Sequence, residues 1–117
     1  MRSFNSQVDL LSRLVRASEM RHEAISQNIA NVNTAGYRRL EVEFEHLLAE
    51  EIRSGSEVNG NAQPELKEAV GFPIRADGSN VDLDREIGDL NKNALLQQTY
   101  LRMLAHNIQQ MRTAIEG

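Results

Sequence analysis

The sequence of 117 residues contains no cysteine and no tryptophan, and aromatic residues make up only 4% of it. Without cysteine the chain has no disulfide, no thiolate nucleophile and no cysteine-ligated zinc. With so few aromatic side chains, leucine, isoleucine, valine and alanine must fill the interior. These absences exclude a disulfide scaffold and a cysteine-based enzyme, and the length is that of a single domain.

An excess of positive charge and a long hydrophobic run are also missing. The formal net charge is −4 and the arginines are scattered, so nucleic-acid binding is not expected. No stretch reaches the length of a membrane span, and the first residues lack the continuous apolar segment of a secretory signal. We therefore expect neither direct membrane insertion nor export through a cleaved signal.

Apolar residues near the N-terminus recur at alternate steps of three and four residues. This spacing predicts a helix that packs along another helix. Asn5 or Ser6 is a candidate N-cap for it, and Gly36 is a candidate stop signal. The positions, six of eight apolar, are Val8, Leu11, Val15, Ser18, His22, Ile25, Ile29 and Val32.

The C-terminal part repeats the same spacing more regularly. It predicts a helix over 83–115, roughly 50 Å long. Asp82 can cap this helix, and Asp84 and Glu86 place negative charge in its first turn, where the helix dipole favours it. Nine of its ten positions are apolar: Leu83, Ile87, Leu90, Ala94, Gln97, Leu101, Leu104, Ile108, Met111 and Ile115.

The middle of the chain has a different character. Residues 54–80 hold four of the seven glycines and both prolines, so we expect much of this segment to be mobile, with short extended pieces such as 71–74 that become ordered against a partner. Residues 40–44 alternate like a strand, whereas Phe44, Leu47, Leu48 and Ile52 have helical spacing. Both alternatives stay open for that region.

These patterns predict a mainly α fold in which two long terminal helices pack as an antiparallel, coiled-coil-like hairpin around a flexible or weakly β middle. Within one domain we expect an N-terminal helix and turn (1–37), a variable, partly disordered middle (38–80) and a C-terminal helix (81–117). A two-helix hairpin cannot enclose both apolar stripes. We therefore expect burial to be completed by further copies or by other helical proteins.

No group of residues has the spacing of a catalytic or metal site. His22, His46 and His106 are far apart in sequence, and His22 and His106 fit partly buried packing positions better than metal ligands. Asp77 begins a calcium-like loop, but the twelfth position is Gly88 instead of a bidentate glutamate. We expect no enzyme activity, no cofactor and no metal.

An acidic run is interpreted as a solvated face in preference to a cation site. Its residues are Glu41, Glu43, Glu45, Glu50 and Glu51.

The stretch NIANVNTAGYRR, residues 28–39, is unusually dense in asparagine. Asn28, Asn31 and Asn33 are poor helix formers that bond to backbone, and Gly36 can adopt positive φ, so the stretch predicts a defined turn at the end of the first helix. Tyr37 would anchor the exit from the turn. Arg38 and Arg39 would stay in water or meet acidic neighbours. An ordinary helix terminus explains only one or two of the asparagines.

Residues 25–37, ISQNIANVNTAGY, resemble the N-terminal signature of the rod and hook proteins of the bacterial flagellum, with Ala35 where proline is usual. Residues 77–87, DGSNVDLDREI, followed by Leu90, Asn93, Ala94 and Leu95, resemble the C-terminal motif of proximal-rod proteins of the FlgB type. The two matches cover about a third of the chain. The run 96–100, LQQTY, departs from the close family's usual pattern.

The resemblance implies a non-enzymatic subunit of the proximal rod of the flagellar basal body, which crosses the periplasm, transmits torque and lines the export channel. It implies passage through the flagellar type III export apparatus, self-association, and contact with other rod proteins, the rod-to-ring junction protein and the export gate. From the residues alone, the alternative is a cytoplasmic helical adaptor or export chaperone that offers its apolar stripes to a client helix.

The residues expected at assembly interfaces are Leu11, Val15, Ile25, Ile29, Leu83, Ile87, Leu90, Leu101, Leu104, Ile108, Met111 and Ile115. The residues expected to form the family turn are Asn28, Asn31, Asn33, Thr34, Gly36 and Tyr37.

Overall fold

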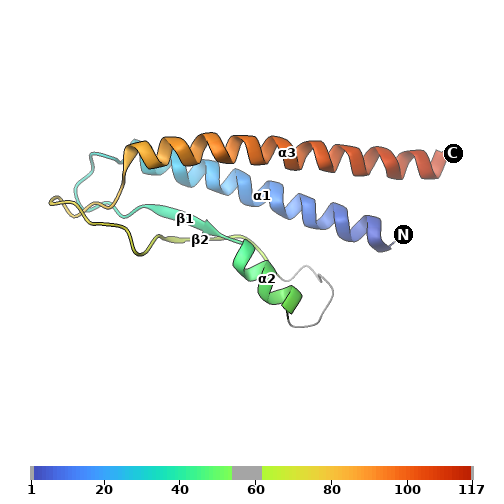
Figure 1. Ribbon diagram of the computed structural model, residues 1–117, viewed down its shortest axis with the longest axis horizontal. Helices are drawn as coiled ribbons and strands as arrows, with labels where there is room; N and C mark the ends of the chain where they lie inside the picture. Colours follow the sequence, from blue (N-terminus) through green and yellow to red (C-terminus); the bar gives the residue numbers. More distant parts are fainter. Residues whose placement is uncertain (1, 54–61, 117) are drawn as a thin grey trace.

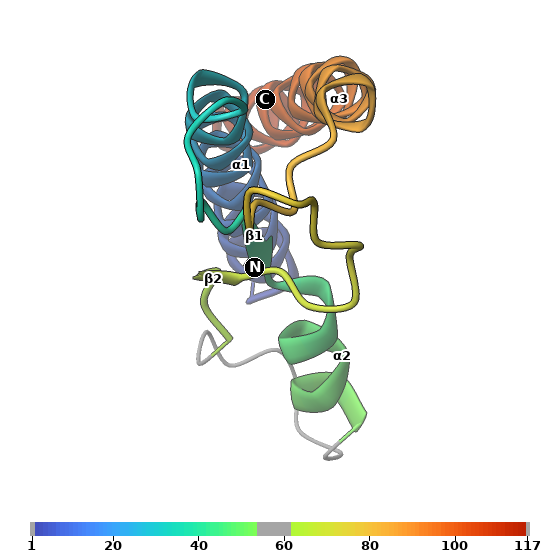
Figure 2. The same ribbon diagram turned by 90° about the vertical axis from the view of Figure 1, so that its left-hand side faces the viewer.

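The computed structural model describes residues 2–53 and 62–116, in the order α1 (Arg2–Ala30), β1 (Leu40–Glu43), α2 (Glu45–Arg53), β2 (Glu65–Glu68) and α3 (Leu83–Glu116). The two long helices lie antiparallel and in contact, and the two-stranded sheet and α2 lie on one side of α1 (Figure 1, Figure 2). The molecule is elongated, measuring 62 × 29 × 14 Å. The predicted mainly α fold with a paired helical hairpin and a weakly β middle is confirmed.

The first helix is longer at its N-terminal end than the sequence suggested. It begins at Arg2, so the prediction that Asn5 or Ser6 caps it is wrong; both residues lie inside α1. A residue with capping propensity does not start a helix when the residues before it can also be helical. α1 ends at Ala30, six residues before Gly36, so the prediction that Gly36 stops this helix is wrong; its φ of 75° belongs to the turn that follows.

Residues 40–53 combine the two alternatives that periodicity left open. The alternating part is the strand β1, and the part with helical spacing is the helix α2. Phe44, between them, is fully buried against Ala17 and Ala62. Leu14, Leu47 and Leu48 surround this small core, which attaches the middle of the chain to α1.

The sheet contains only β1 and β2, paired antiparallel from Leu40 opposite Glu68 to Glu43 opposite Glu65. The edge of β1 that faces away from β2 is covered by α1. The Asn28 side chain bonds both the N–H and the C=O of Leu40, at 2.8 and 2.9 Å, and Arg21 donates to the carbonyl oxygen of Val42. Side chains of α1 thus supply the hydrogen bonds of a third strand.

The segment that leads into α3 is a sequence of tight turns. Gly78 has a φ of 85°, and the Asp77 carboxylate accepts from the N–H of Ser79 at 3.0 Å. Asp82 then caps α3 as predicted, because its carboxylate accepts from the N–H groups of Asp84 and Arg85. Of the middle segment expected to be mobile, residues 54–61 lie outside the described residues, and 62–80 form β2 and these turns.

Replacing Phe44 with alanine should lower the free energy of unfolding by about 3 to 5 kcal/mol, because it empties the centre of the small core. Urea unfolding followed by circular dichroism measures the change. Val70→Ala, at a side chain that is 81% exposed, is the matched control and should cost less than about 0.5 kcal/mol. Equal losses in the two variants would contradict this placement of the core.

Candidate assembly surface and the polar junction behind it

Asn28, in the last turn of α1, is fully buried and uses its whole amide. Besides the two bonds to Leu40, its oxygen accepts from the Tyr37 hydroxyl at 3.0 Å and its NH2 group donates to Glu86 at 3.2 Å. One side chain therefore connects α1, the exit from the turn, β1 and the first turns of α3. Asn28 of the predicted family turn therefore links several elements, and its role is not limited to ending α1.

Glu86 is a carboxylate with no exposed surface, and Arg39 neutralises it. The Arg39 Nε donates to Glu86 Oε1 at 2.6 Å, and the Arg39 side chain is itself only 6% exposed. The backbone N–H of Arg39 donates to the Asn80 side chain at 2.7 Å. An unpaired buried charge is costly, so this ion pair holds the chain around Arg39, just after the asparagine-rich turn, in one position against α3.

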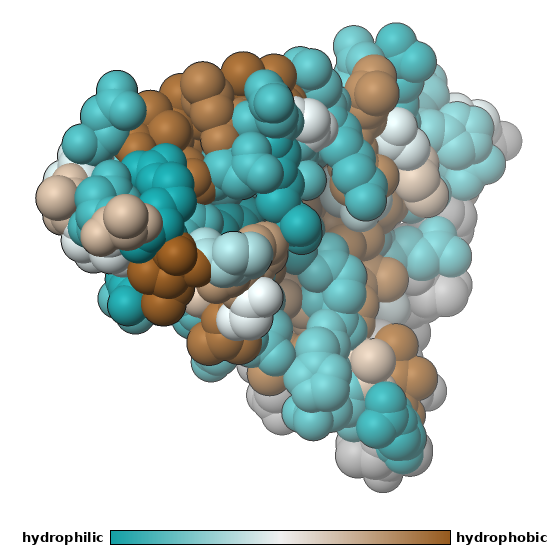
Figure 3. Space-filling model, turned by 60° about the vertical axis from the view of Figure 1, so that its left-hand side comes forward, coloured by the Kyte–Doolittle hydropathy of each residue, from teal (hydrophilic) through white to brown (hydrophobic). Residues whose placement is uncertain are grey.

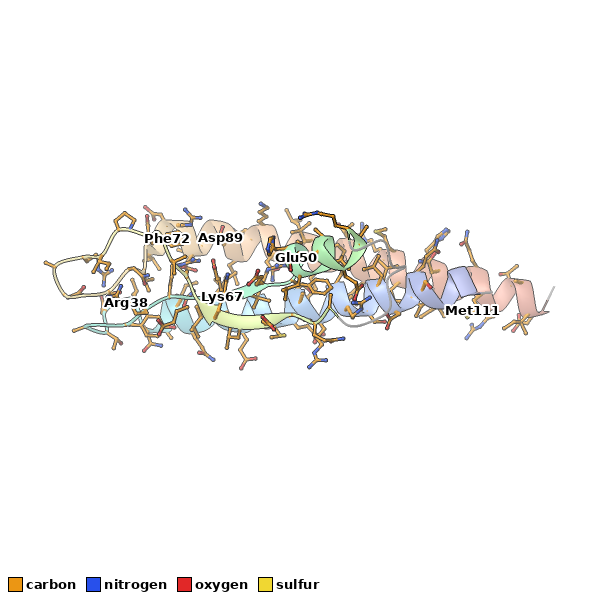
Figure 4. All side chains as sticks on the ribbon, turned by 90° about the horizontal axis from the view of Figure 1, so that it is seen from below. Arg38, Glu50, Lys67, Phe72, Asp89 and Met111 are labelled. Atoms are coloured by element: carbon orange, nitrogen blue, oxygen red, sulfur yellow. The ribbon has the colours of Figure 1, made fainter. Side chains whose placement is uncertain are left out.

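Phe72 covers this ion pair from outside. The guanidinium of Arg39 lies 4.3 Å from the centre of the Phe72 ring, and the guanidinium of Arg85 lies 4.4 Å from it. Figure 4 shows Phe72 beside Asp89, near the start of α3. The segment 71–74, expected to become ordered against a partner, instead contacts this chain through Phe72, while Ile74 stays 55% exposed.

The two motifs that carry the family resemblance meet at this end of the hairpin. The N–H of Gly36 donates to the carbonyl oxygen of Asp77 at 2.8 Å. A Cβ on Gly78 would lie 3.4 Å from the Cα of Gly36, so the two backbones are in close contact. Arg75 links the two turns, because it donates to the carbonyl oxygens of Val32 at 2.5 Å and Val81 at 2.9 Å.

Burial and nearby charges affect the pKa of the Tyr37 hydroxyl. Burial of Tyr37 and the nearby charge of Glu86 raise the pKa of its hydroxyl, against the opposing effect of Arg39, and this hydroxyl donates to Asn28. These groups, together with the paired backbones of the two turns, form a closed end of the hairpin, which we call the polar junction. It consists of Asn28, Gly36, Tyr37, Arg39, Arg75, Gly78 and Glu86.

A second ion pair joins α1 to α2. Glu45 is hydrogen-bonded to Arg21. Partial burial acts to raise the pKa of Glu45, but the Arg21 guanidinium outweighs it and holds that pKa below its usual value. The pair contributes stability at neutral pH that is lost as the pH falls through the folded-state pKa of Glu45.

The inner face of α3, toward α1, contains several polar residues. Asn93 is buried and donates to the carbonyl oxygen of Ser18 at 2.7 Å, which joins the two helices near their middle. Most of the buried and half-buried positions of α3 recur at steps of three and four residues. Among these, every second one belongs to the predicted stripe, and the others lie one residue before a predicted position. They include Glu86, Leu90, Asn93, Gln97, Tyr100, Leu104, Asn107 and Met111.

The residues predicted for assembly fall into three groups. Two are buried within the chain and five are half-buried, while the other five are exposed by 41% or more. Leu11 and Ile25 are buried; Val15, Ile29, Leu90, Leu104 and Met111 are half-buried; and Leu83, Ile87, Leu101, Ile108 and Ile115 are exposed. We call these last five the outer stripe.

The outer stripe follows one side of α3 along most of its length. Figure 3 shows apolar residues at the surface of the upper part of the molecule, where α1 and α3 lie. Toward the free ends of the two helices, where Figure 4 marks Met111, few side chains of α3 are covered by this chain. The surface available to a neighbour is thus apolar and helical, and it lies away from the polar junction.

Two expectations about polar side chains need correction. His22 and His106 are exposed, so neither is a packing residue, and His46 pairs with Glu50 at 3.1 Å on the surface of α2. The acidic run is not wholly solvated, because the Glu51 side chain is only 6% exposed and lies beside Arg13. Glu51 Oε1 accepts from the N–H of Ala62, which links α2 to the residues just before β2.

Residues 2–53 and 62–116 contain no group of three histidine, aspartate or glutamate side chains placed to hold a metal ion. In the same part of the chain no helix is long and apolar enough to cross a membrane.

Comparison with known proteins gives the family. A family profile described as flagella basal body rod protein matches residues 17–38, which include every residue of the predicted family turn. The flagellar basal body rod protein FlgB of Yersinia ruckeri is 30% identical over 82% of this chain and 83% of its own length. This chain belongs to the FlgB family of flagellar basal body rod proteins.

Other FlgB proteins match along almost the whole chain. That of Borrelia hermsii is 29% identical over 99% of this chain and 100% of its own length, and that of Bacillus subtilis is 21% identical over 100% and 98%. The likeness to FlgB proteins therefore extends through the middle segment and both helices, well beyond the turn that the family profile covers.

Sequence reasoning found the turn but missed most of its partners. The sequence predicts Glu86 only as a charge in the first turn of its helix, and Arg39 only as a residue that stays in water or meets an acidic neighbour. An acidic residue on the apolar side of a helix, one position from Ile87, was the available signal for Glu86. Nothing local marked Arg75, whose partners at Val32 and Val81 are set by the packing of two turns.

Asn28→Asp should lower the free energy of unfolding by at least about 2 kcal/mol, because it removes the donor to Leu40 and Glu86 and places a second carboxylate beside Glu86. Urea unfolding measures the loss. The control is Asn33→Asp, an exposed asparagine of the same turn, which should change stability by less than about 0.5 kcal/mol. A similar effect in both variants would show that the polar junction does not depend on Asn28.

The glycines should respond oppositely to alanine. Gly36→Ala should destabilise by about 1 to 2 kcal/mol, because alanine disfavours the positive φ of that position. Gly88→Ala, inside α3 where a Cβ meets nothing within 4 Å, should stabilise by about 1 kcal/mol. Thermal and urea unfolding of the two variants check the sign, and two changes of the same sign would contradict the turn geometry.

Proposed function

We propose that this chain is a structural, non-catalytic subunit of the proximal rod of the flagellar basal body. The observation that supports it most directly is the outer stripe, an apolar surface on a member of a rod-protein family that its own chain leaves uncovered. An exposed apolar stripe with this spacing fits burial against other helices in an assembly.

Assembly through both terminal helices would use the predicted residues in two ways. Leu11 and Ile25, which are buried, contribute to the packing within one subunit. The outer stripe, with the partly covered Leu104 and Met111, is offered to neighbouring subunits. The polar junction sets the angle at which the two helices leave the closed end, and so sets the surface that a neighbour meets.

The proposed division of labour follows the three segments of the chain. The described residues of segments 1–37 and 81–117 provide the bundling helices, and those of segment 38–80 form a side lobe attached through Phe44. Helices bundled lengthwise into a tube are stiff along its axis, which suits a rod that transmits torque and encloses an export channel. The expected partners are other copies, other rod proteins, the rod-to-ring junction protein and the export gate.

The proposed location is the periplasmic rod of the basal body, reached through the flagellar type III apparatus. The alternative function, a cytoplasmic helical adaptor or export chaperone, is less favoured because the chain matches FlgB proteins over nearly their full length. No observation on the described residues singles out a client helix.

The test is a double substitution in the outer stripe. Ile108→Gln with Ile115→Gln should abolish incorporation into basal bodies and swimming, because it makes polar the surface offered to neighbours, while the isolated protein keeps its helical circular dichroism. Incorporation is measured by peptide mass spectrometry on detergent-washed basal bodies from a strain that carries only the variant.

The control for this test is Met103→Gln, also at a half-exposed apolar side chain of α3 but off the stripe. It should enter basal bodies and support swimming. Normal motility of the double variant would contradict the proposal, and absence of the unsubstituted chain from basal bodies that contain other rod proteins would contradict it outright.

A further inference from the structure

The small sheet has one protected edge and one open edge. β1 lies between α1 and β2, and Asn28 of α1 bonds the edge of β1 that faces it (Figure 1, Figure 2). All four residues of β2 are exposed, and no strand among the described residues pairs with its outer side. A two-stranded sheet is marginally stable by itself and gains stability from a third strand.

The register identifies the backbone groups that the open edge offers. The N–H of Ala69 donates to the carbonyl oxygen of Arg39 at 2.9 Å, and in an antiparallel pair such bonds recur at every second residue. Leu66 and Glu68 lie at the alternate positions of β2, so their N–H and C=O groups point away from β1. The described residues, 2–53 and 62–116, supply no hydrogen bond to either backbone.

The opposite strand agrees with this assignment. Leu40 and Val42 stand opposite Glu68 and Leu66 in the register, and their backbone groups point away from β2, toward side chains of α1. Both outer edges of the sheet therefore carry backbone groups that β1 and β2 leave unpaired, and α1 supplies partners on β1 alone.

Side chains along the open edge are acidic and apolar. Glu65 and Glu68 form no ion pair with a described residue. Lys67, the one cation of β2, already lies 3.0 Å from Glu43 and 3.8 Å from Glu41. The Leu66 side chain is 52% exposed between these charges. The edge therefore favours a strand that brings basic residues to the two glutamates and an aliphatic residue to the leucine.

We propose that the outer edge of β2 binds an extended segment of a different protein as an antiparallel third strand. The segment carries a basic residue opposite Glu68, an aliphatic residue opposite Leu66 and a basic residue opposite Glu65, so its pattern is basic, any residue, aliphatic, basic. Backbone bonds to Leu66 and Glu68 hold the strand, and the side-chain pairs select its sequence. The inference goes beyond the proposed function, because it gives the side lobe a partner of its own.

Charge and sequence both argue against a second copy of the chain as the occupant. β1 and β2 together carry four glutamates and one lysine, so a second β2 would bring glutamates against glutamates. The required pattern occurs once in this chain, at 13–16, and those residues lie inside α1. A second copy therefore has no extended segment that fits the edge.

The test is a titration of the isolated, isotope-labelled chain with a short synthetic peptide, followed by NMR. The peptide is blocked at both ends, and its centre is lysine, threonine, valine and lysine in that order. We expect the N–H groups of Leu66 and Glu68 to exchange at least about tenfold more slowly in the complex, and that of Lys67, which already faces β1, to change much less. A peptide with glutamates in place of the lysines should not slow them.

Two variants separate backbone pairing from attraction between charges. Leu66→Pro removes an outward N–H and should abolish binding, whereas the matched control Leu66→Thr keeps that N–H and should bind. Glu65→Lys with Glu68→Lys should reverse the preference and bind the glutamate peptide.

Three results would overturn the inference: equal effects of the two peptides, unchanged exchange at Leu66 and Glu68, or undiminished binding to a folded Leu66→Pro chain. If Leu66→Pro does not fold, the charge reversal decides by itself. None of these results depends on incorporation into basal bodies, so the proposed function is tested separately.

Discussion

The buried ion pair between Arg39 and Glu86 is the contact on which the closed end of the molecule depends. A carboxylate with no exposed surface is tolerable only with its partner present, so the pair requires the chain after the first turn to lie against the start of α3. Asn28 then has one consistent arrangement, in which its amide serves α1, β1 and α3 together. The two glycine turns meet as a result, 42 residues apart in the sequence and in close contact in space.

The kind of contact that holds the molecule together differs between the closed end and the free ends of the helices. The polar junction is rich in specific hydrogen bonds, and such networks define one arrangement more sharply than apolar contact does. Farther along, large aliphatic side chains of α3 face outward. A subunit with one self-sufficient end and one incomplete end is well suited to an assembly, because its geometry is set before its last surface is buried.

The parts of the fold that repeat were predictable, and the parts that depend on a single partner were not. Heptad spacing identified both long helices, and Asp82 was correctly placed as a cap, because these signals are local. The inner face of α3 was not predictable in detail: Asn93 lies on it because the Ser18 carbonyl oxygen accepts its amide, a pairing that no local rule foresees. His22 has the spacing of the seam but is exposed. Of the candidate interface, the sequence indicated the apolar positions, and only the structure separated those used within the chain from those left outside.

Amide hydrogen exchange on the isolated protein tests the division between the two ends most directly. The N–H of Leu40, bonded to Asn28, and the N–H of Gly36, bonded to Asp77, should exchange slowly, since opening them requires breaking the buried ion pair. The amides of α3 from Leu101 to Ile115 should exchange much faster and become protected only in assembled rods. The reverse order, with the C-terminal half of α3 protected in the monomer and the polar junction exchanging freely, would contradict this account.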